Sequence, residues 1–276
     1  MTDPLVPAGI RVHRDVVHTK LEGYRPLSLD LYLPDAGATA VCVYVHGGGW
    51  RVGSRRSGPG PMSPSSSRWL ARMAQDGLAV AAVDYRFSGE ARFPAQLHDV
   101  AAAVRWLRDD SRFELGHLPF TVFGASAGGL LAALAALDSS LEIRAAALWY
   151  AVSDIATMPE DQAAVGGPLD PPGESREELL IGGLVADLPE VARAASPVHQ
   201  VRAEAPPFFL LHGGDDILVP VRQSERLHAT LLAAGASSTL EQVEGYGHML
   251  AGIPDSELEA LVDRTAAFLL AERSTP

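Results

Sequence analysis

The sequence has 276 residues, of which 47% are hydrophobic and 20% are charged. These values are typical of a folded domain, and they exclude a fibrous repeat and a largely disordered chain. The 22 Lys and Arg residues against 34 Asp and Glu residues give a formal net charge of −12, which argues against binding to nucleic acid or to an anionic membrane.

The N-terminal residues contain no basic segment followed by an apolar stretch, and no run approaches about eighteen uninterrupted apolar residues. We therefore expect a cytoplasmic protein. The single cysteine, Cys42, lies in the apolar run AVCVYV and cannot form an internal disulfide. We expect its side chain to be a small buried hydrophobic group.

Eight short apolar segments that end at turn residues have the character of β-strands. They are residues 10–18, 27–34, 40–47, 78–85, 120–124, 144–151, 207–213 and 237–245. Helical patterns lie between the later segments: one follows Pro94, one runs from Pro220 to Gly235, and one covers residues 258–269. Strands that alternate with helices predict an α/β fold, with a mostly parallel eight-stranded sheet and helices on both faces.

Two stretches interrupt this alternation. Residues 51–67 are rich in Gly, Pro and Ser, and they predict an irregular, mobile loop. Residues 153–205 contain two short helical patterns, at 177–183 and 188–195, and are too short for an independent domain. We expect this insertion to form a small cap over one end of the sheet, within a single domain of residues 1–276.

The segment TVFGASAGGLLAALAAL places Ser126 between Gly124 and Gly128, at the junction of a strand and a helix. Such a tight turn forces its central residue into a strained conformation, and the flanking glycines let the strand and the helix approach closely. The hydroxyl would then lie above the sheet at a helix N-terminus. This context predicts that Ser126 is a nucleophile.

A serine nucleophile needs a base and a carboxylate that orients this base, here in the chain order Ser, Asp or Glu, His. His248 is predicted as the base because it lies in a glycine-rich turn between the last strand and the last helix. Asp216, after the strand at 207–213, is predicted as the carboxylate, with Asp215 second and Glu244 third. We expect structural or surface roles for His13, His18, His98, His117, His199 and His228.

Acyl transfer also needs donors for the oxyanion, and the motif HGGGW directly follows a predicted strand. A phosphate-binding glycine loop is the alternative, but the lysine that a P-loop requires does not follow. We therefore predict an oxyanion hole formed by the backbone amides of Gly48, Gly49 and Ala127. His46 is expected to be a structural hydrogen-bonding residue.

These motifs together resemble the α/β-hydrolase-fold carboxylesterases, in particular the bacterial esterase and lipase group related to hormone-sensitive lipase and to feruloyl-esterase-like and acetyl-esterase enzymes. The segments that carry the resemblance lie between about residues 27 and 270: LDLYLP, VYVHGGGWRVGS, VAAVDYRFSGEARFPAQLHDVAAAVRWLR, VFGASAGG, ESREELLIGG, ASPVHQV, LLHGGDDILVP and GYGH. The resemblance implies the same roles for the residues named above. It also implies that Asp84, Arg86 and Asp99 are scaffold residues.

We therefore expect a serine carboxylesterase that cleaves short- to medium-chain acyl esters through an acyl-enzyme. Trp50 and Met158 are candidate substrate-binding residues of the pocket wall. The chemistry requires no metal or organic cofactor, the expected partner is a small-molecule ester, and the oligomeric state, a homodimer included, is open. An amidase, formamidase or peptidase, a pathway-specific thioesterase or dehydratase, and a non-catalytic binding protein remain alternatives, since a fold does not fix function.

Overall fold

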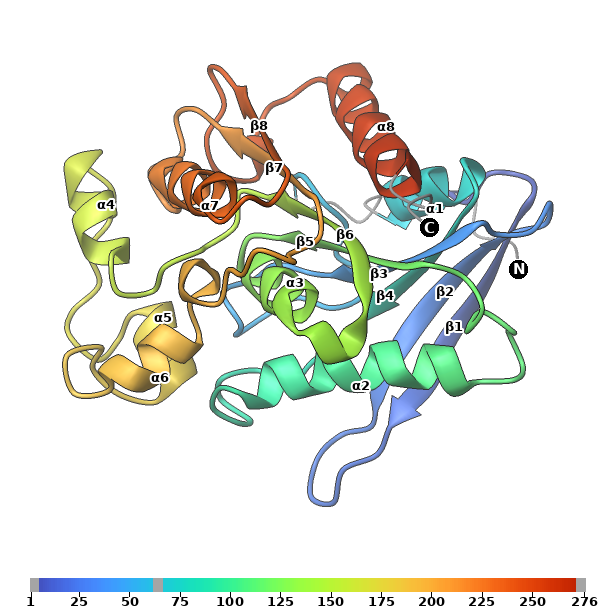
Figure 1. Ribbon diagram of the computed structural model, residues 1–276, viewed down its shortest axis with the longest axis horizontal. Coiled ribbons are helices and arrows are strands. Elements are labelled where there is room, and N and C mark those ends of the chain that lie inside the picture. Colours follow the sequence, from blue (N-terminus) through green and yellow to red (C-terminus); the bar gives the residue numbers. More distant parts are fainter. Residues whose placement is uncertain (1–4, 62–66, 272–276) are drawn as a thin grey trace.

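The computed structural model describes residues 5–61 and 67–271, and within these residues the chain forms one eight-stranded sheet (Figure 1). The order is β1-β2-β4-β3-β5-β6-β7-β8. β2 pairs antiparallel with β1 and β4, and the strands from β4 to β8 run parallel, which confirms the predicted α/β architecture. The strands are β1 (Ile10–Thr19), β2 (Leu27–Pro34), β3 (Ala40–Val45), β4 (Leu78–Val83), β5 (Phe120–Ala125), β6 (Ile143–Trp149), β7 (Phe208–Gly213) and β8 (Ser238–Val243).

The central strands are buried on both faces. Every residue of β3, β4, β5 and β7 is buried, which explains their nearly continuous apolar sequences. Cys42 lies in β3 with no exposed surface, and burial raises the pKa of its thiol to about 12. This thiol is therefore protonated at neutral pH and packs as the small hydrophobic group that the sequence predicts.

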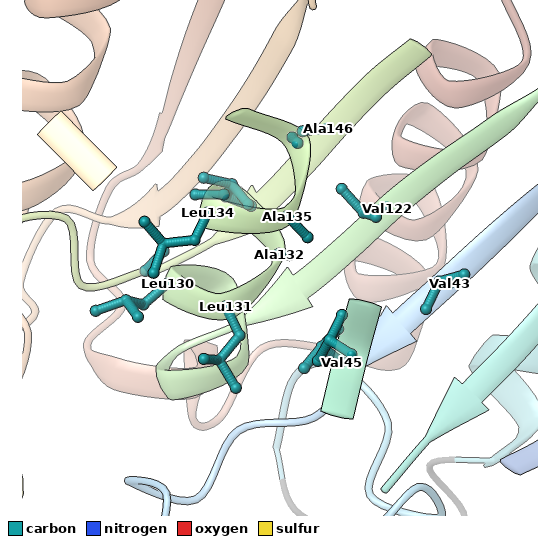
Figure 2. Close-up of a cluster of buried hydrophobic side chains, with 14 of the residues drawn as sticks. Val43, Val45, Val122, Leu130, Leu131, Ala132, Leu134, Ala135 and Ala146 are labelled. Atoms are coloured by element: carbon teal, nitrogen blue, oxygen red, sulfur yellow. The ribbon is translucent and has the colours of Figure 1, made fainter. Parts of the chain in front are cut away.

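One face of the sheet is covered by α2 (Ala95–Asp109), α3 (Ala127–Leu137) and α7 (Arg222–Ala233). α3 lies over the middle of the sheet, and all eleven of its residues are buried. Figure 2 shows Leu130, Leu131 and Leu134 of this helix beside Val45 of β3 and Val122 of β5. The helix that follows Ser126 is thus packed into the core along its whole length, which holds the preceding turn in place.

The other face is covered by α1 (Ser67–Gln75) and α8 (Asp255–Ala271), which pack against each other. α1 is not among the predicted helices, although Trp69, Leu70 and Met73 give it an apolar face. It includes Ser67, so the loop predicted over 51–67 is shorter than expected. Residues 51–61 are irregular, and residues 62–66 lie outside the described residues, so mobility of this loop stays a prediction.

The insertion, residues 153–205, contains short helices that Figure 1 shows on the side of the molecule opposite the two labelled ends of the chain. α6 falls within the predicted pattern at 188–195 and α5 begins one residue before the pattern at 177–183, whereas α4 is not predicted from the sequence. The segment MPEDQAA of α4 has a Pro in its first turn, followed by two acidic residues, which is a helix-start signal. The helices are α4 (Met158–Ala164), α5 (Arg176–Ile181), α6 (Pro189–Ala194) and the 3-10 turn η2 (Pro197–His199).

Helix α7 begins at Arg222 and not at Pro220, because a turn closed by the hydrogen bond from Gln223 N–H to the Pro220 carbonyl precedes it, at 2.9 Å. Gly235, two residues beyond its last helical residue, has a φ of 84°, the left-handed conformation predicted for this position. Two further 3-10 turns are η1 (Ser139–Leu141) and η3 (His248–Leu250). Within the described residues, no helix is both long enough and apolar enough to cross a membrane.

Candidate active site

Ser126 is the single residue between β5 and α3. Its φ of 53° and ψ of −123° form a backbone conformation that residues with a side chain rarely adopt. The turn is held by a hydrogen bond of 2.8 Å from the Ser126 N–H to the carbonyl of Trp149 at the end of β6. The hydroxyl therefore lies at the carboxyl end of the sheet and at the N-terminus of α3.

The two glycines beside Ser126 are required by the close approach of the backbone. A Cβ at Gly124 would clash with the carbonyl oxygen of Gly128, and a Cβ at Gly128 would clash with the carbonyl oxygens of Val45 and His46. Only glycine lets α3 begin this close to β3 and β5. This is the physical reason that the sequence suggested for the G-x-S-x-G pattern, and the structure confirms it.

His248 lies in the turn after β8, and its Nε2 is 3.0 Å from Ser126 Oγ. The ring of Tyr150 packs edge-on against the imidazole, with the two ring centroids 5.0 Å apart. Met249, the next residue, has a φ of 61°, so the backbone bends sharply directly after the histidine. The turn and the tyrosine together hold the imidazole over the serine hydroxyl.

Asp216 follows β7, and its Oδ2 is 2.6 Å from His248 Nδ1. Its Oδ1 accepts hydrogen bonds from the backbone N–H groups of Leu218 and Val219, each at 2.9 Å. The carboxylate is buried and cannot turn away from the imidazole without losing these bonds. The structure thus places the three predicted triad residues in one continuous chain of hydrogen bonds.

The two alternative carboxylates do not reach the imidazole. Asp215 is exposed, and its backbone N–H donates to the Tyr246 carbonyl at 3.0 Å. Glu244 is exposed as well, and in the described part of the chain neither carboxylate forms a hydrogen bond with His248. Adjacent residues of the turn point in different directions, which is why only Asp216 faces the site.

A second histidine contacts the same carboxylate. His212 Nε2 lies 2.7 Å from the Val219 carbonyl and 3.4 Å from Asp216 Oδ2, and its Nδ1 lies 2.7 Å from Ser224 Oγ. Because a carbonyl can only accept, Nε2 carries the hydrogen and Nδ1 accepts from the serine. Burial alone would raise the pKa of Asp216, but hydrogen bonds from His212 and His248 outweigh burial and lower this pKa to about 2.

His212 is not among the predicted site residues. The available signal was its position at the end of β7, four residues before the carboxylate, in a strand of otherwise apolar residues. It is completely buried and hydrogen-bonded through both ring nitrogens. We assign to it the role of positioning Asp216 and the turn that follows, because it does not contact Ser126.

The backbone amides predicted to bind an oxyanion lie beside Ser126. Gly48 and Gly49 follow β3 with φ values of 115° and 60°, and a Cβ at Gly48 would clash with the Val52 carbonyl. No described residue accepts a hydrogen bond from either N–H group, and both glycines line the same cavity as Ser126. Ala127 is the first residue of α3, so its N–H has no acceptor within the helix. Free amides beside the nucleophile are what an oxyanion hole requires.

The buried side chains of His46 and Trp50 hold the oxyanion loop, residues 46–50, in place. His46 Nδ1 donates to the Gly47 carbonyl at 2.6 Å, and its ring stacks on Tyr85 with a centroid distance of 4.5 Å. Burial lowers the pKa of His46 to about 4, so the ring is neutral at pH 7 and has the structural role expected from the sequence. Trp50 Nε1 donates to the Ala127 carbonyl at 2.9 Å and thereby ties the loop to the start of α3.

The chain that follows the oxyanion loop is anchored by buried ion pairs. Arg55 donates from its backbone N–H to Asp84 at 2.9 Å and from its guanidinium Nε to Asp30 at 2.8 Å. Arg86 and Asp99 form a second pair at 2.7 Å. These contacts match the scaffold role that the family resemblance implies for Asp84, Arg86 and Asp99. The two Arg55 contacts also hold the chain after the oxyanion loop against the sheet.

Ser126 opens into a cavity of about 230 Å³. Trp50 lies on its wall, as expected, beside Val152 and Tyr150. Two further wall residues come from the insertion and are not among the predicted site residues: Arg176 and Glu177, in the first turn of α5. Their location depends on how the insertion packs on the oxyanion loop, so no local sequence signal could have identified them.

The structure places the other predicted wall residue, Met158, away from this cavity. Met158 is the first residue of α4, is buried, and lines a second cavity of about 260 Å³ within the insertion. Met158 is therefore not a wall residue of the cavity that contains Ser126, because it lies in the first turn of α4, a helix that the sequence did not predict.

Chemically, this arrangement can activate a hydroxyl. The imidazole Nε2 accepts the proton of Ser126 as the oxygen attacks, and the ionised Asp216 stabilises the imidazolium that forms. Free amides at Gly48, Gly49 and Ala127 can bind the oxygen on which negative charge develops.

Comparisons with known proteins identify the family of this chain. The BD-FAE family model matches residues 29–231, which is more than half of the chain and includes Ser126 and Asp216. The chain is 34% identical over 211 residues to Esterase LipQ of Mycobacterium tuberculosis (strain ATCC 25618 / H37Rv), covering 72% of this chain and 47% of LipQ. It therefore spans about half the length of that relative.

In two further comparisons, the matched region covers a larger share of the other protein. The chain is 30% identical over 251 residues to the Acetyl-hydrolase of Streptomyces hygroscopicus, covering 86% of this chain and 73% of that protein. A truncated form of a carbohydrate esterase from gut microbiota matches with a TM-score of 0.76 at 23% identity, covering 95% of this chain and 96% of the other. This structural likeness shows the α/β-hydrolase fold. The chain belongs to the BD-FAE family.

Proposed function

We propose that the protein is a serine hydrolase that cleaves carboxylic esters of small molecules through an acyl-enzyme. The observation that carries this proposal is the chain of hydrogen bonds from Ser126 Oγ through His248 to Asp216, beside free backbone amides in one cavity. The esterase names of LipQ and other relatives support the reaction class.

The reaction follows from the positions of the side chains. His248 Nε2 takes the proton from Ser126 Oγ as this oxygen attacks the ester carbonyl carbon. The amides of Gly48, Gly49 and Ala127 bind the resulting oxyanion, and His248 then returns the proton to the departing alkoxide. A water molecule, activated by the same imidazole, hydrolyses the acyl-enzyme. Asp216 stays ionised throughout and stabilises the imidazolium.

The size of the cavity favours short- to medium-chain acyl groups. Its volume of about 230 Å³ is below the range of roughly 300–1,000 Å³ that is common for sites of drug-sized ligands. The wall contributed by Trp50, Tyr150 and Val152 is mostly apolar, which suits an alkyl or aryl substituent of the ester.

The test is hydrolysis of p-nitrophenyl esters from acetate to palmitate by the wild type and by Ser126→Ala. We expect activity that is highest for the shorter chains and that falls at least about 10⁴-fold in the variant, since the nucleophile is lost. Ser139→Ala, on an exposed turn, is the matched control and should leave the activity unchanged. Hydrolysis that survives in Ser126→Ala would disprove the proposed mechanism.

A further inference from the structure

The insertion holds a second cavity of about 260 Å³ with no assigned role. Three acidic residues and two neutral polar residues contribute to its wall, but apolar side chains form more than half of it. The apolar residues are Ile155, Met158, Pro159, Leu169, Pro172 and Val185. Such a space suits an alkyl or aryl group more than a strongly hydrated one.

One residue lines both this cavity and the cavity that contains Ser126. Glu177, in the first turn of α5, belongs to the walls of both. The two spaces therefore adjoin at this residue. We expect that removing its side chain beyond Cβ opens the junction between them without changing any residue of the proposed triad.

Side-chain hydrogen bonds fix the start of α5, whereas the Glu177 carboxyl group accepts only from its own backbone N–H within the described residues. Ser175 Oγ accepts from the Glu178 N–H at 3.1 Å, and the Glu178 carboxylate accepts from the Gly173 N–H at 2.7 Å. This reciprocal cap holds the first turn of the helix. By contrast, no other side chain within the described ranges donates a hydrogen bond to the Glu177 carboxyl group.

The position of Glu177 is not that of an ordinary surface acid. Its side chain is partly buried, and this burial raises the pKa of its carboxyl group. Placing a carboxyl group between two mainly apolar spaces is unfavourable for stability. Solubility alone therefore does not explain a glutamate at this position.

The geometry of the reaction indicates which part of an ester would point toward Glu177. The departing alcohol must lie near His248 Nε2, and the residues grouped around this histidine are Tyr150 and Met249. Arg176, the neighbour of Glu177, instead lies against Gly49 of the oxyanion loop, where a Cβ would clash with its side chain. The first turn of α5, which carries both residues, therefore lies on the side of the oxyanion loop, and we assign the acyl group of the ester to that side.

We propose that the second cavity is an extension of the acyl-binding site and that Glu177 is the residue that closes it, which restricts the wild type to acyl groups that fit in the first cavity. This inference rests on the proposed ester hydrolysis. It predicts that the side chain at position 177 sets acyl-chain length, and that the space behind it accepts the distal methylene groups of a longer acyl chain.

The test measures kcat/KM for p-nitrophenyl butyrate and octanoate with the wild type, Glu177→Ala and Glu177→Gln. We expect the octanoate-to-butyrate ratio to rise about tenfold or more in Glu177→Ala, the effect of roughly two additional buried methylene groups. Glu177→Gln keeps the size of the side chain and should keep the wild-type ratio. Glu190→Ala, an exposed glutamate on α6 of the same insertion, is the matched control and should also keep it.

Two further measurements make the inference specific. Val185→Trp, introduced into Glu177→Ala, fills the second cavity and should return the ratio to the wild-type value. A series of alkyl butyrates, in which only the alcohol varies, should show the same chain-length profile in the wild type and in Glu177→Ala. A change in the alcohol series with none in the acyl series would overturn the assignment to the acyl group.

Failure of the inference can be distinguished from failure of the proposed function. An unchanged acyl-chain profile in Glu177→Ala, in a protein whose butyrate hydrolysis is lost in Ser126→Ala, overturns the role of Glu177 and leaves the ester hydrolase intact. Absence of Ser126-dependent hydrolysis in the wild type overturns the proposed function, and the role of Glu177 with it.

Discussion

The turns at the carboxyl end of the sheet and the insertion contribute to one cavity in different ways. Ser126, Asp216 and His248 lie one, three and five residues after a strand end, and hydrogen bonds to neighbouring backbone or side chains hold them. Arg176 and Glu177 lie on a helix of six residues within the insertion, and neither forms an ion pair with a described residue. The sheet thus fixes the reacting atoms, and the insertion shapes the space around them.

The electrostatics differ in the same way. Hydrogen bonds lower the pKa of Asp216 to about 2 despite its burial, whereas the pKa of Glu177 is raised because burial outweighs the hydrogen bond from its own backbone N–H and the charge of Arg176. Because hydrogen bonds compensate for its burial, the Asp216 carboxylate is stable in its charged form and can stabilise the imidazolium of His248. A carboxyl group without a side-chain partner, such as that of Glu177, can be replaced with little loss of hydrogen bonding, so the insertion can change specificity while the chemistry is kept.

The division between a sheet that performs the chemistry and an insertion that sets specificity would be contradicted most clearly if a substitution in the triad affected only some esters. Asp216→Asn keeps the size of the side chain but supports the wrong imidazole tautomer, so kcat should fall about 10⁴-fold for every acyl chain length. Steady-state kinetics with acetate, butyrate and octanoate esters measure this. A loss confined to long chains would show that Asp216 acts on substrate binding.

Gly48→Ala tests the oxyanion loop with a smaller expected effect. The added methyl group would clash with the Val52 carbonyl, and the position has a φ of 115°, so the loop must shift and its amides must leave their positions. We expect kcat to fall by about 10² to 10³, with a smaller change in KM. Gly173→Ala, in an open turn of the insertion where a Cβ has space but φ is 84°, controls for backbone strain alone. Equal kcat losses in both variants would contradict an oxyanion role for Gly48.

Much of the sheet end could be predicted because its features are local in sequence. The eight strands have distinct apolar segments, and Ser126, Asp216 and His248 each follow one in a turn of recognisable composition. The position of Met158 and the roles of Arg176 and Glu177 could not be predicted in this way. They depend on how α4 and α5 pack within the insertion and against Gly49, and these contacts join residues far apart in the chain. The short helices α1 and α4 lack the long periodicity that makes a helix recognisable.

The free energy of unfolding should fall in acid because His46 is buried in its neutral form. Burial lowers the pKa of this histidine to about 4, while in the unfolded chain it is about 6.5. Between these values only the unfolded chain takes up the proton, so stability is fully present above pH 6.5 and is lost as the pH falls toward 4. The loss is at most about 3 kcal/mol. His46→Asn, which keeps a donor for the Gly47 carbonyl, should show a shallower pH dependence of the urea-unfolding free energy. The same slope in both proteins would exclude His46 as a cause.

Arg176→Ala should have the smallest effect. It tests whether a residue of the insertion affects substrate binding and not the chemical step. Its side chain covers Gly49 but contributes no hydrogen bond within the described residues, so kcat should stay within about twofold while KM changes a few-fold. Kinetics with the butyrate ester measure both constants. A kcat loss as large as that of Gly48→Ala would mean that the insertion also positions the reacting groups.

The central claim is that Ser126 is a nucleophile activated by its surroundings, and covalent labelling tests it most directly. The protein is treated with a fluorophosphonate, and intact mass and peptide mapping locate the adduct. The account predicts one adduct per chain on Ser126, none in Ser126→Ala, and much slower labelling in Asp216→Asn. Absence of an adduct in the wild type, or an adduct on another residue, would contradict the account.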